Sequence, residues 1–168
     1  MADDQALLLE EQIPALRRYA FALVRDHEAA DDLVQDCLER ALSRWYLRRP
    51  EGDLRAWLFT ILRNLYINAY RARKRRGVGT ATGDTHPSVA PEQEAGLQAR
   101  DVLAAIDKLP EEQKSLLLLI GVEDLSYEQA AQVLAIPVGT VMSRLSRARQ
   151  RLRTFMEDGC APLLRRVK

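Results

Sequence analysis

The sequence has few of the residues on which metal sites, disulfides and nucleophilic catalysis depend. Its 168 residues include two cysteines and two histidines. Cys37 and Cys160 lie far apart without a CxxC motif or a neighbouring histidine pair, so neither a disulfide framework nor a zinc site is indicated. His27 and His86 fall in a predicted turn and a predicted linker, with no nucleophile or acid pair nearby. We therefore expect no cofactor, no bound metal and no enzymatic activity.

Long apolar runs and strand-like alternation are also missing. No stretch approaches the ~20 apolar residues that span a bilayer, and the N-terminus lacks a basic segment followed by an apolar run. We therefore expect a cytoplasmic protein without direct membrane insertion. Hydrophobic residues still make up 47% of the chain, and they recur at helical spacing. The sequence predicts an all-α protein with real cores.

An excess of charge of one sign is absent, because the net charge is only +1. The distribution of charge is nevertheless uneven. Residues 26–39 contain six carboxylates and neither lysine nor arginine, whereas residues 63–76 contain six basic residues and no acid. This layout is expected of an adaptor that binds one protein and one nucleic acid.

Residues 77–96 divide the chain into two parts. They contain four glycines and two prolines with little apolar periodicity, which predicts a flexible linker. We expect two small helical domains, of residues 1–76 and 97–168. In the first domain, one helix ends near Arg25, and a second, capped by Asp26, runs to about Trp45. A loop over 46–53 then leads to a long helix over 54–75.

Helical periodicity predicts which faces of the first domain are buried. The second helix should bury Leu33, Val34, Cys37, Leu38, Ala41, Leu42 and Trp45, and the third Trp57, Leu58, Ile61, Leu62, Leu65 and Ala69. The outer edge of the second helix is then acidic. On the third helix, amide and guanidinium side chains recur at four, three and four residues, with Tyr66 and Tyr70 nearby: Asn64, Asn68, Arg71 and Arg75. Such a face suits single-stranded nucleic acid, although the tyrosines could instead pack against neighbouring helices.

Residues 125–153 predict a helix, a tight turn and a second helix that carries arginines. Ser126 and Gln129 form a capping-box pattern, and Pro137 suits the first turn of the second helix. Val141, Leu145, Ala148 and Leu152 form an apolar stripe that should face the core, leaving serine, arginine and glutamine outside. A solvated amphipathic helix is the alternative. We favour a DNA-binding helix-turn-helix, because a capped helix precedes this one and no acid lies between Thr140 and Phe155.

The rest of the second domain lacks a charged cluster of its own. One helix carries Val102, Leu103, Ile106 and Leu109 and is stopped by Pro110, and another contains residues 116–120. We expect these helices to be a scaffold that closes a core around the helix-turn-helix.

Four motifs in this order resemble the extracytoplasmic-function (ECF) sigma factors, group IV of the sigma-70 family and promoter-recognition subunits of bacterial RNA polymerase. They are DDLVQD at residues 31–36, RAWLF at 55–59 leading to RN at 63–64, LP at 109–110, and LSYEQAA at 125–131 continuing through VGTV at 138–141 to SR at 143–144. The resemblance covers essentially the whole chain.

The resemblance implies a role for each candidate surface. Contact with the clamp coiled coil of the largest polymerase subunit falls to Asp31, Asp32, Gln35, Asp36, Glu39 and Arg40, and the family also contacts the flap of core polymerase. Capture of a flipped base at the promoter −10 element falls to the 46–53 loop with Trp57, Asn64, Asn68, Arg71 and Arg75. Reading of the −35 duplex falls to Ser143, Arg144, Ser146, Arg147, Arg149, Gln150 and Arg151. An anti-sigma factor that occludes both DNA-binding domains is implied as a further partner.

Two positions depart from the family pattern. Many relatives carry a basic residue where this chain has Met142 and a larger side chain where it has Ser146, so the −35 sequence it reads cannot be borrowed from a relative. A polymerase-independent transcription factor is a competing hypothesis, in which only the C-terminal helices read DNA and the first domain senses a signal. A domain that senses a signal would need neither the acidic edge nor the Asn/Arg stripe. A nuclease would need metal-binding carboxylates beside a basic cleft, whereas the carboxylates here lie on one solvated helix edge.

Overall fold

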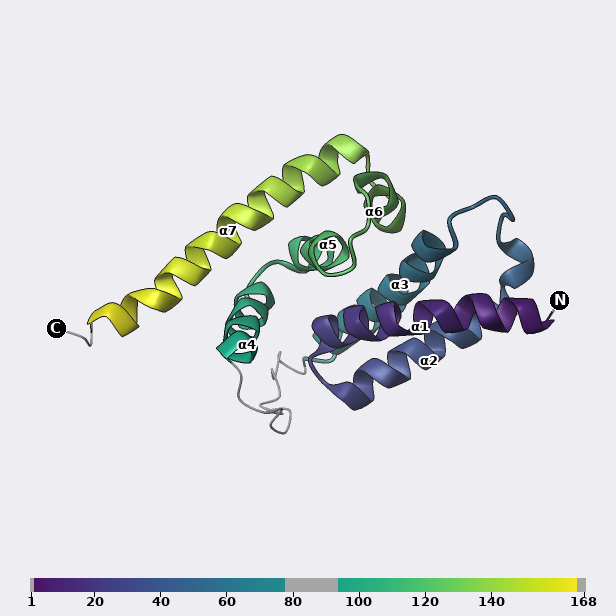
Figure 1. The fold of residues 1–168 in the computed structure, drawn as a ribbon, viewed down its shortest axis with the longest axis horizontal. Coiled ribbons are helices and arrows are strands. Elements are labelled where there is room, and N and C mark those ends of the chain that lie inside the picture. The colour runs from purple at the N-terminus through teal and green to yellow at the C-terminus, as the bar shows by residue number, and fades with distance from the viewer. Residues whose placement is uncertain (1, 78–93, 166–168) are drawn as a thin grey trace.

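The computed structural model describes residues 2–77 and 94–165, and within these ranges the chain is helical without strands (Figure 1). This agrees with the predicted all-α class. Within the same ranges, none of the helices combines the length and the apolarity needed to cross a membrane. The described part also contains no group of three or more His, Cys, Asp or Glu side chains that could hold a metal ion.

The first domain consists of α1 (Ala2–Val24), α2 (His27–Ser43), a short 3-10 helix η1 (Trp45–Leu47) and α3 (Leu54–Arg75). Aspartates cap two of these helices, as short side-chain acceptors do at N-termini. Asp26 accepts a hydrogen bond from the Ala29 amide, and Asp53 accepts one from the Ala56 amide, each at 3.1 Å. The cap at Asp26 and the helix beginning at Leu54 were predicted, whereas η1 occupies the start of the predicted loop.

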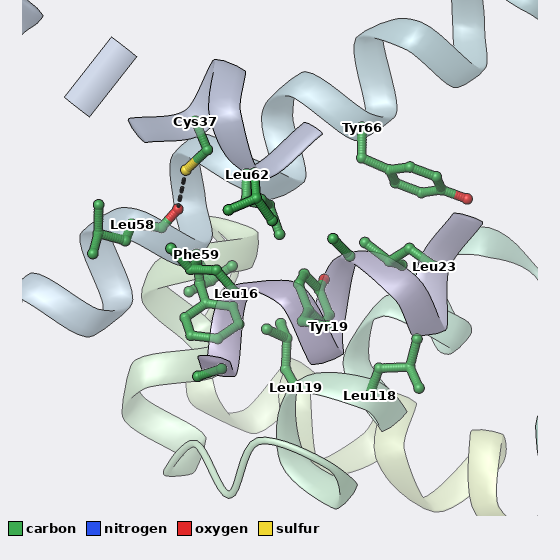
Figure 2. Close-up of a cluster of buried hydrophobic side chains, with 14 of the residues drawn as sticks. Leu16, Tyr19, Leu23, Cys37, Leu58, Phe59, Leu62, Tyr66, Leu118 and Leu119 are labelled. Carbon is green, nitrogen blue, oxygen red and sulfur yellow. Dashed lines mark hydrogen bonds between the residues drawn. The ribbon is translucent and has the colours of Figure 1, made fainter. Parts of the chain in front are cut away.

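The core of the first domain forms where α1, α2 and α3 meet (Figure 2). The fully buried rings of Tyr19 and Phe59 pack edge to face, with their centroids 5.2 Å apart. Cys37 is fully buried, as predicted, and its Sγ lies 3.5 Å from the carbonyl oxygen of Leu58.

Cys37 should not react with thiol reagents in the folded protein. Burial raises the pKa of its thiol to about 12, so at pH 8 only about one molecule in ten thousand carries the reactive thiolate. In a Cys160→Ser variant, we expect almost no reaction with Ellman's reagent until denaturant is added, and then one equivalent of thiol. Rapid reaction of the native variant would contradict the burial, and a Cys37→Ser/Cys160→Ser chain gives the baseline.

The second domain consists of α4 (Glu94–Asp107), α5 (Glu111–Gly121), α6 (Tyr127–Leu134) and α7 (Val138–Arg165). Its own core lies between α5, α6 and α7 and contains Leu109, Leu116, Leu117, Ala130, Ala131, Val141, Leu145 and Ala148. Helix α4 begins inside the segment predicted as linker, whose residues 78–93 lie outside the described residues. The chain leaves α4 through Leu109 and Pro110, as the sequence predicted.

Helix α5 closes the core of the second domain, as expected, and it also packs against the first domain. Leu118 and Leu119 are fully buried and belong to the apolar cluster of Leu16, Tyr19 and Leu23 on α1 (Figure 2). Leu116 and Leu117, on the other side of α5, face the second core. Four consecutive leucines point to more than one side of a helix, so they are all buried only where elements cover both sides. Here the first domain covers the second side of α5.

Two predicted core residues on the first domain are exposed instead. Leu42 is 51% exposed and lies in the last turn of α2, which ends one residue later. Ala69 is also exposed, because it lies in the C-terminal half of α3, where its side faces solvent. Periodicity identified the apolar stripe on each helix. It did not show how far along the helix a neighbouring helix covers that stripe.

Candidate nucleic-acid interface

The helix-turn-helix of the second domain is built by local hydrogen bonds. At the start of α6, Ser126 Oγ accepts a hydrogen bond from the Gln129 amide at 3.0 Å, and Gln129 Oε1 accepts one from the Ser126 amide at 2.9 Å. This is the predicted capping box. The turn reverses at Ala135, which has a left-handed φ of 52°, while Gly139 lies within the first turn of α7. The bend at Ala135 therefore comes before Pro137 and Gly139, the residues from which the turn was predicted.

Helix α7 presents a polar face outward, as expected. Val141, Leu145 and Ala148 are at most 2% exposed and fix the orientation of the helix on α5 and α6. The residues of the predicted −35 set that are solvent-exposed are Ser143, Ser146, Arg147, Arg149, Gln150 and Arg151. Their side chains can donate to base edges or phosphates. In Figure 1 this stretch lies in the half of α7 next to α6.

Arg144 differs from the other arginines of this set. Its Nη1 lies 3.3 Å from Glu112 Oε2 on α5, and its side chain is one third exposed. The sequence did not predict this ion pair, because the partner comes from another helix. The other residues of the predicted −35 set therefore form the exposed face of α7. Arg144 also links α7 to α5 through its ion pair.

A hollow of about 380 Å³ lies beside α7 on the side where Tyr127 of α6 contributes to its lining. Its lining includes Ser146, Arg149 and Gln150 of the predicted set. It also includes Tyr127 and Arg153, which were not in that set, and Met142, which is 54% exposed. Tyr127 could not be found from the spacing along α7, because it comes from α6.

A second candidate surface runs along α3. Asn64, Asn68, Arg71 and Arg75 are all exposed, and a hollow of about 590 Å³ is lined by Asn68, Arg71, Lys74 and Arg75. Lys74 lies in the basic run but was not in the predicted set. Amide and guanidinium groups gathered along one helix can bind a phosphate backbone and the edges of unpaired bases.

The aromatic residues of this surface divide between packing and exposure. Tyr66 is buried, and its ring lies 6.3 Å from that of the half-buried Tyr70, so the packing alternative is the right one for Tyr66. Trp57 lies two turns before Asn64 on the same side of α3, about 10 Å along the helix. It is half-buried and meets Trp45 edge to face at 6.1 Å, and Arg48 lies 4.9 Å from the centroid of the Trp45 ring.

The acidic edge of α2 forms a third surface. Its exposed residues are Asp31, Asp32, Gln35, Asp36, Glu39 and Arg40. Asp31 accepts a hydrogen bond from Arg17 at 2.9 Å, which, with the positive charge of Arg17, holds the pKa of that carboxyl below its usual range. Gln35 donates to Glu39 at 3.3 Å. Asp32 and Asp36 are therefore exposed to solvent on this edge and take no part in the ion pair between Arg17 and Asp31.

Exposed apolar side chains continue this edge beyond the end of α2. Leu42, Tyr46 and Leu47 are 51%, 80% and 63% exposed. Apolar side chains bordered by charged ones are typical of protein-binding surfaces. Sequence reasoning missed this part, because Leu42 was expected in the core. The high apolar content of residues 42–47, next to an acidic run, could have indicated this apolar surface.

Family models match both domains. Residues 9–63 match the model described as the Sigma2 domain of PhyR, and residues 99–152 match that of sigma-70, region 4. The ECF RNA polymerase sigma factor EcfG of Rhodopseudomonas palustris is 43% identical over 146 residues, 86% of this chain and 80% of that protein. The ECF RNA polymerase sigma factor SigL of Mycobacterium tuberculosis is 34% identical over 161 residues, 90% of this chain and 88% of the relative.

Solved structures give the same result. The sigma factor RpoE of Bartonella quintana, in complex with the anti-sigma factor NepR, is 38% identical with a TM-score of 0.74, covering 92% of this chain and 96% of the other. CnrH, in complex with the cytosolic domain of CnrY, has the same TM-score at 24% identity and shows a shared fold. The chain belongs to the ECF sigma factors of the sigma-70 family, group IV.

Proposed function

We propose that this protein recruits core RNA polymerase to a set of promoters in the cytoplasm, reads −35 duplex with α7 and captures −10 single strand with α3. The observation that carries the proposal is the arginine-bearing outer face of α7, oriented by its buried stripe. The acidic edge of α2 with Leu42, Tyr46 and Leu47 supplies a polymerase-binding surface. Membership in the sigma factors favours this division of labour over an independent transcription factor or a nuclease.

The first domain would also assist promoter melting. Extruding a base from the duplex costs a few kcal/mol, and contacts that exist only with the open strand must offset that cost. The exposed amides of Asn64 and Asn68 lie one turn apart on α3 and can hydrogen-bond to a base edge, while Arg71 and Arg75 can bind the flanking phosphates.

An anti-sigma factor is the regulatory partner we propose. The sigma factor RpoE of Bartonella quintana, which is 38% identical to this chain, was solved in complex with the anti-sigma factor NepR. Such a partner would need to cover the α7 face, the α3 stripe or both.

Transcription reconstituted from core polymerase and genomic DNA tests the function as a whole. Adding this chain should create new start sites that share −10 and −35 sequences, and an unchanged map would contradict the proposal. Asn68→Ala should reduce permanganate-detected opening at these promoters and leave −35 duplex binding intact, because duplex contacts come from α7.

Arg147→Ala should weaken binding to the −35 duplex found in that experiment. Arg147 is fully outside the core, so folding should be unaffected, and loss of a base contact costs roughly 1–3 kcal/mol. Fluorescence anisotropy on matched and scrambled duplexes measures the effect. Arg100→Ala, an exposed arginine on α4, is the control. An equal loss on both duplexes would assign Arg147 to phosphate binding instead of base recognition.

A further inference from the structure

One apolar side chain interrupts the polar outer face of α7. Between Val138 and Asp158, where the structure describes the side chains of this helix, Met142 is the one exposed residue with a large apolar side chain, and it is 54% exposed. The other exposed residues of this stretch are polar or charged, apart from Gly139. Isolated apolar residues on a surface are ordinary, so Met142 is informative only through its position and its neighbours.

The position of Met142 is on the DNA-facing part of the helix-turn-helix. It is the fifth residue of α7, and the first turns of a recognition helix are the part that reaches base edges in the major groove. The preceding residue, Val141, is fully buried and fixes how the helix is rotated. Ser146 lies one turn further on and is also exposed. Because residues four apart are neighbours on a helix surface, Met142 and Ser146 lie side by side.

The neighbours of Met142 form a hollow that is partly apolar. Met142, Tyr127 and Leu145 contribute to its lining, together with polar residues that include Ser146 and Gln150. Leu145 is 2% exposed and Tyr127 is half-buried, so Met142 is the most exposed of the three apolar residues. Ser146 has only a hydroxymethyl group, which leaves space beside the Met142 thioether. The hollow can therefore receive a small apolar group that has polar groups next to it.

Duplex DNA offers one apolar group in its major groove, the C5-methyl of thymine. The other groups on the base edges there are hydrogen-bond donors and acceptors. Against a guanine or cytosine edge, the Met142 side chain would displace water without replacing its hydrogen bonds, which is costly. Against thymine, it would bury a methyl group on an apolar surface. The unbranched, flexible methionine side chain adapts well to such a contact.

We infer that Met142 determines specificity in the −35 contact, because it selects a T·A pair by packing on the C5-methyl of the thymine. Ser146 hydrogen-bonds to the polar base edge beside that methyl group, as serine can with several bases. This assignment rests on the proposed function, since it requires that α7 reads the −35 duplex. The −35 element of this protein therefore contains at least one thymine whose methyl group contributes to binding.

Uracil isolates the methyl group, because it lacks only the C5-methyl of thymine and pairs with adenine in the same way. The probes are promoter duplexes found in the transcription experiment, with each −35 thymine on either strand replaced in turn. Competition anisotropy with the full chain bound to core polymerase measures affinity. One replacement should weaken binding roughly 4-fold, the contribution of one buried methyl group. A −35 element without thymine on either strand, or without any sensitive thymine, would overturn the assignment.

Two substitutions test whether the methyl contact belongs to Met142. Met142→Ala removes the thioether and should bind the thymine and uracil duplexes equally. Met142→Leu keeps an apolar side chain and should still prefer thymine. Leu7→Ala, at a 60% exposed leucine on α1, is the matched control and should keep the full preference. If Met142→Ala still distinguishes thymine from uracil, another residue reads the methyl group and the assignment is wrong.

Binding to core polymerase without DNA separates a base contact from a protein contact. Met142→Ala should bind core polymerase as tightly as the unmodified chain. A weaker complex, together with an unchanged preference for thymine, would assign Met142 to a protein partner and overturn the base contact. Failure of the unmodified chain to direct polymerase to any promoter would count against the proposed function itself. A recognised promoter without a methyl-dependent −35 position would overturn the role of Met142 alone.

Discussion

Replacing both Asp32 and Asp36 by lysine should lower the affinity for core RNA polymerase by at least about 100-fold. Both carboxylates are exposed on the acidic edge of α2, so the fold should tolerate the change. At a docking surface, however, each lysine would meet the positive groups that the carboxylates complement, and like-charge contacts cost several kcal/mol. A pull-down or anisotropy titration with core polymerase measures the loss.

The matched control reverses the same number of charges on another helix of the first domain. Glu10 and Glu11 are exposed on α1, and Glu10→Lys/Glu11→Lys changes the net charge equally. If the edge of α2 docks on the polymerase, this control should bind almost normally. Equal weakening by both double variants would mean that overall charge, and not a docking surface on α2, sets the affinity.

Phe59→Ala should cost about 3–5 kcal/mol of unfolding free energy, as large-to-small changes of buried aromatic residues do. Phe59 is fully buried, packs edge to face on Tyr19 and has the Arg55 guanidinium 5.3 Å from its ring centroid. The total stability of a domain is only about 5–15 kcal/mol, so much of the variant should be unfolded in mild urea. Urea denaturation followed by circular dichroism measures the change.

Leu42→Ala is the informative comparison for this prediction. Leu42 was expected in the same core, but it is exposed in the structure, and surface substitutions usually change stability by less than about 0.5 kcal/mol. A Leu42→Ala chain as unstable as Phe59→Ala would show that the end of α2 is covered in solution. A small loss at Phe59 would contradict its central place in the core.

Local chemistry explains why so much of the helix-turn-helix was predictable. The capping box at Ser126, the cap at Asp26 and the helix break at Pro137 depend on residues within a few positions of one another. The buried stripe of α7 follows from a periodicity that any amphipathic helix shows. These features need no knowledge of the rest of the chain, and the predicted boundaries agree with the structure.

Features that depend on distant partners could not be predicted in the same way. Glu123 meets arginines 68 and 105 positions earlier in the chain, and nothing in its neighbourhood distinguishes it from a surface carboxylate. The four consecutive buried leucines of α5 were a signal, because one amphipathic face needs fewer. They indicated a helix that is buried on two sides, but not that the first domain packs against the second side.

Because the Glu123 carboxylate is buried, contacts between the two domains should respond less to ionic strength than contacts with DNA. Mobile ions screen charges in water, but they weaken a desolvated pair much less. The phosphate binding that we propose for the arginines of α7 and α3 should fall steeply as salt rises, because releasing the counterions of DNA then gains less free energy. Rising salt should therefore strip the chain from nucleic acid while leaving the contacts between its domains largely intact.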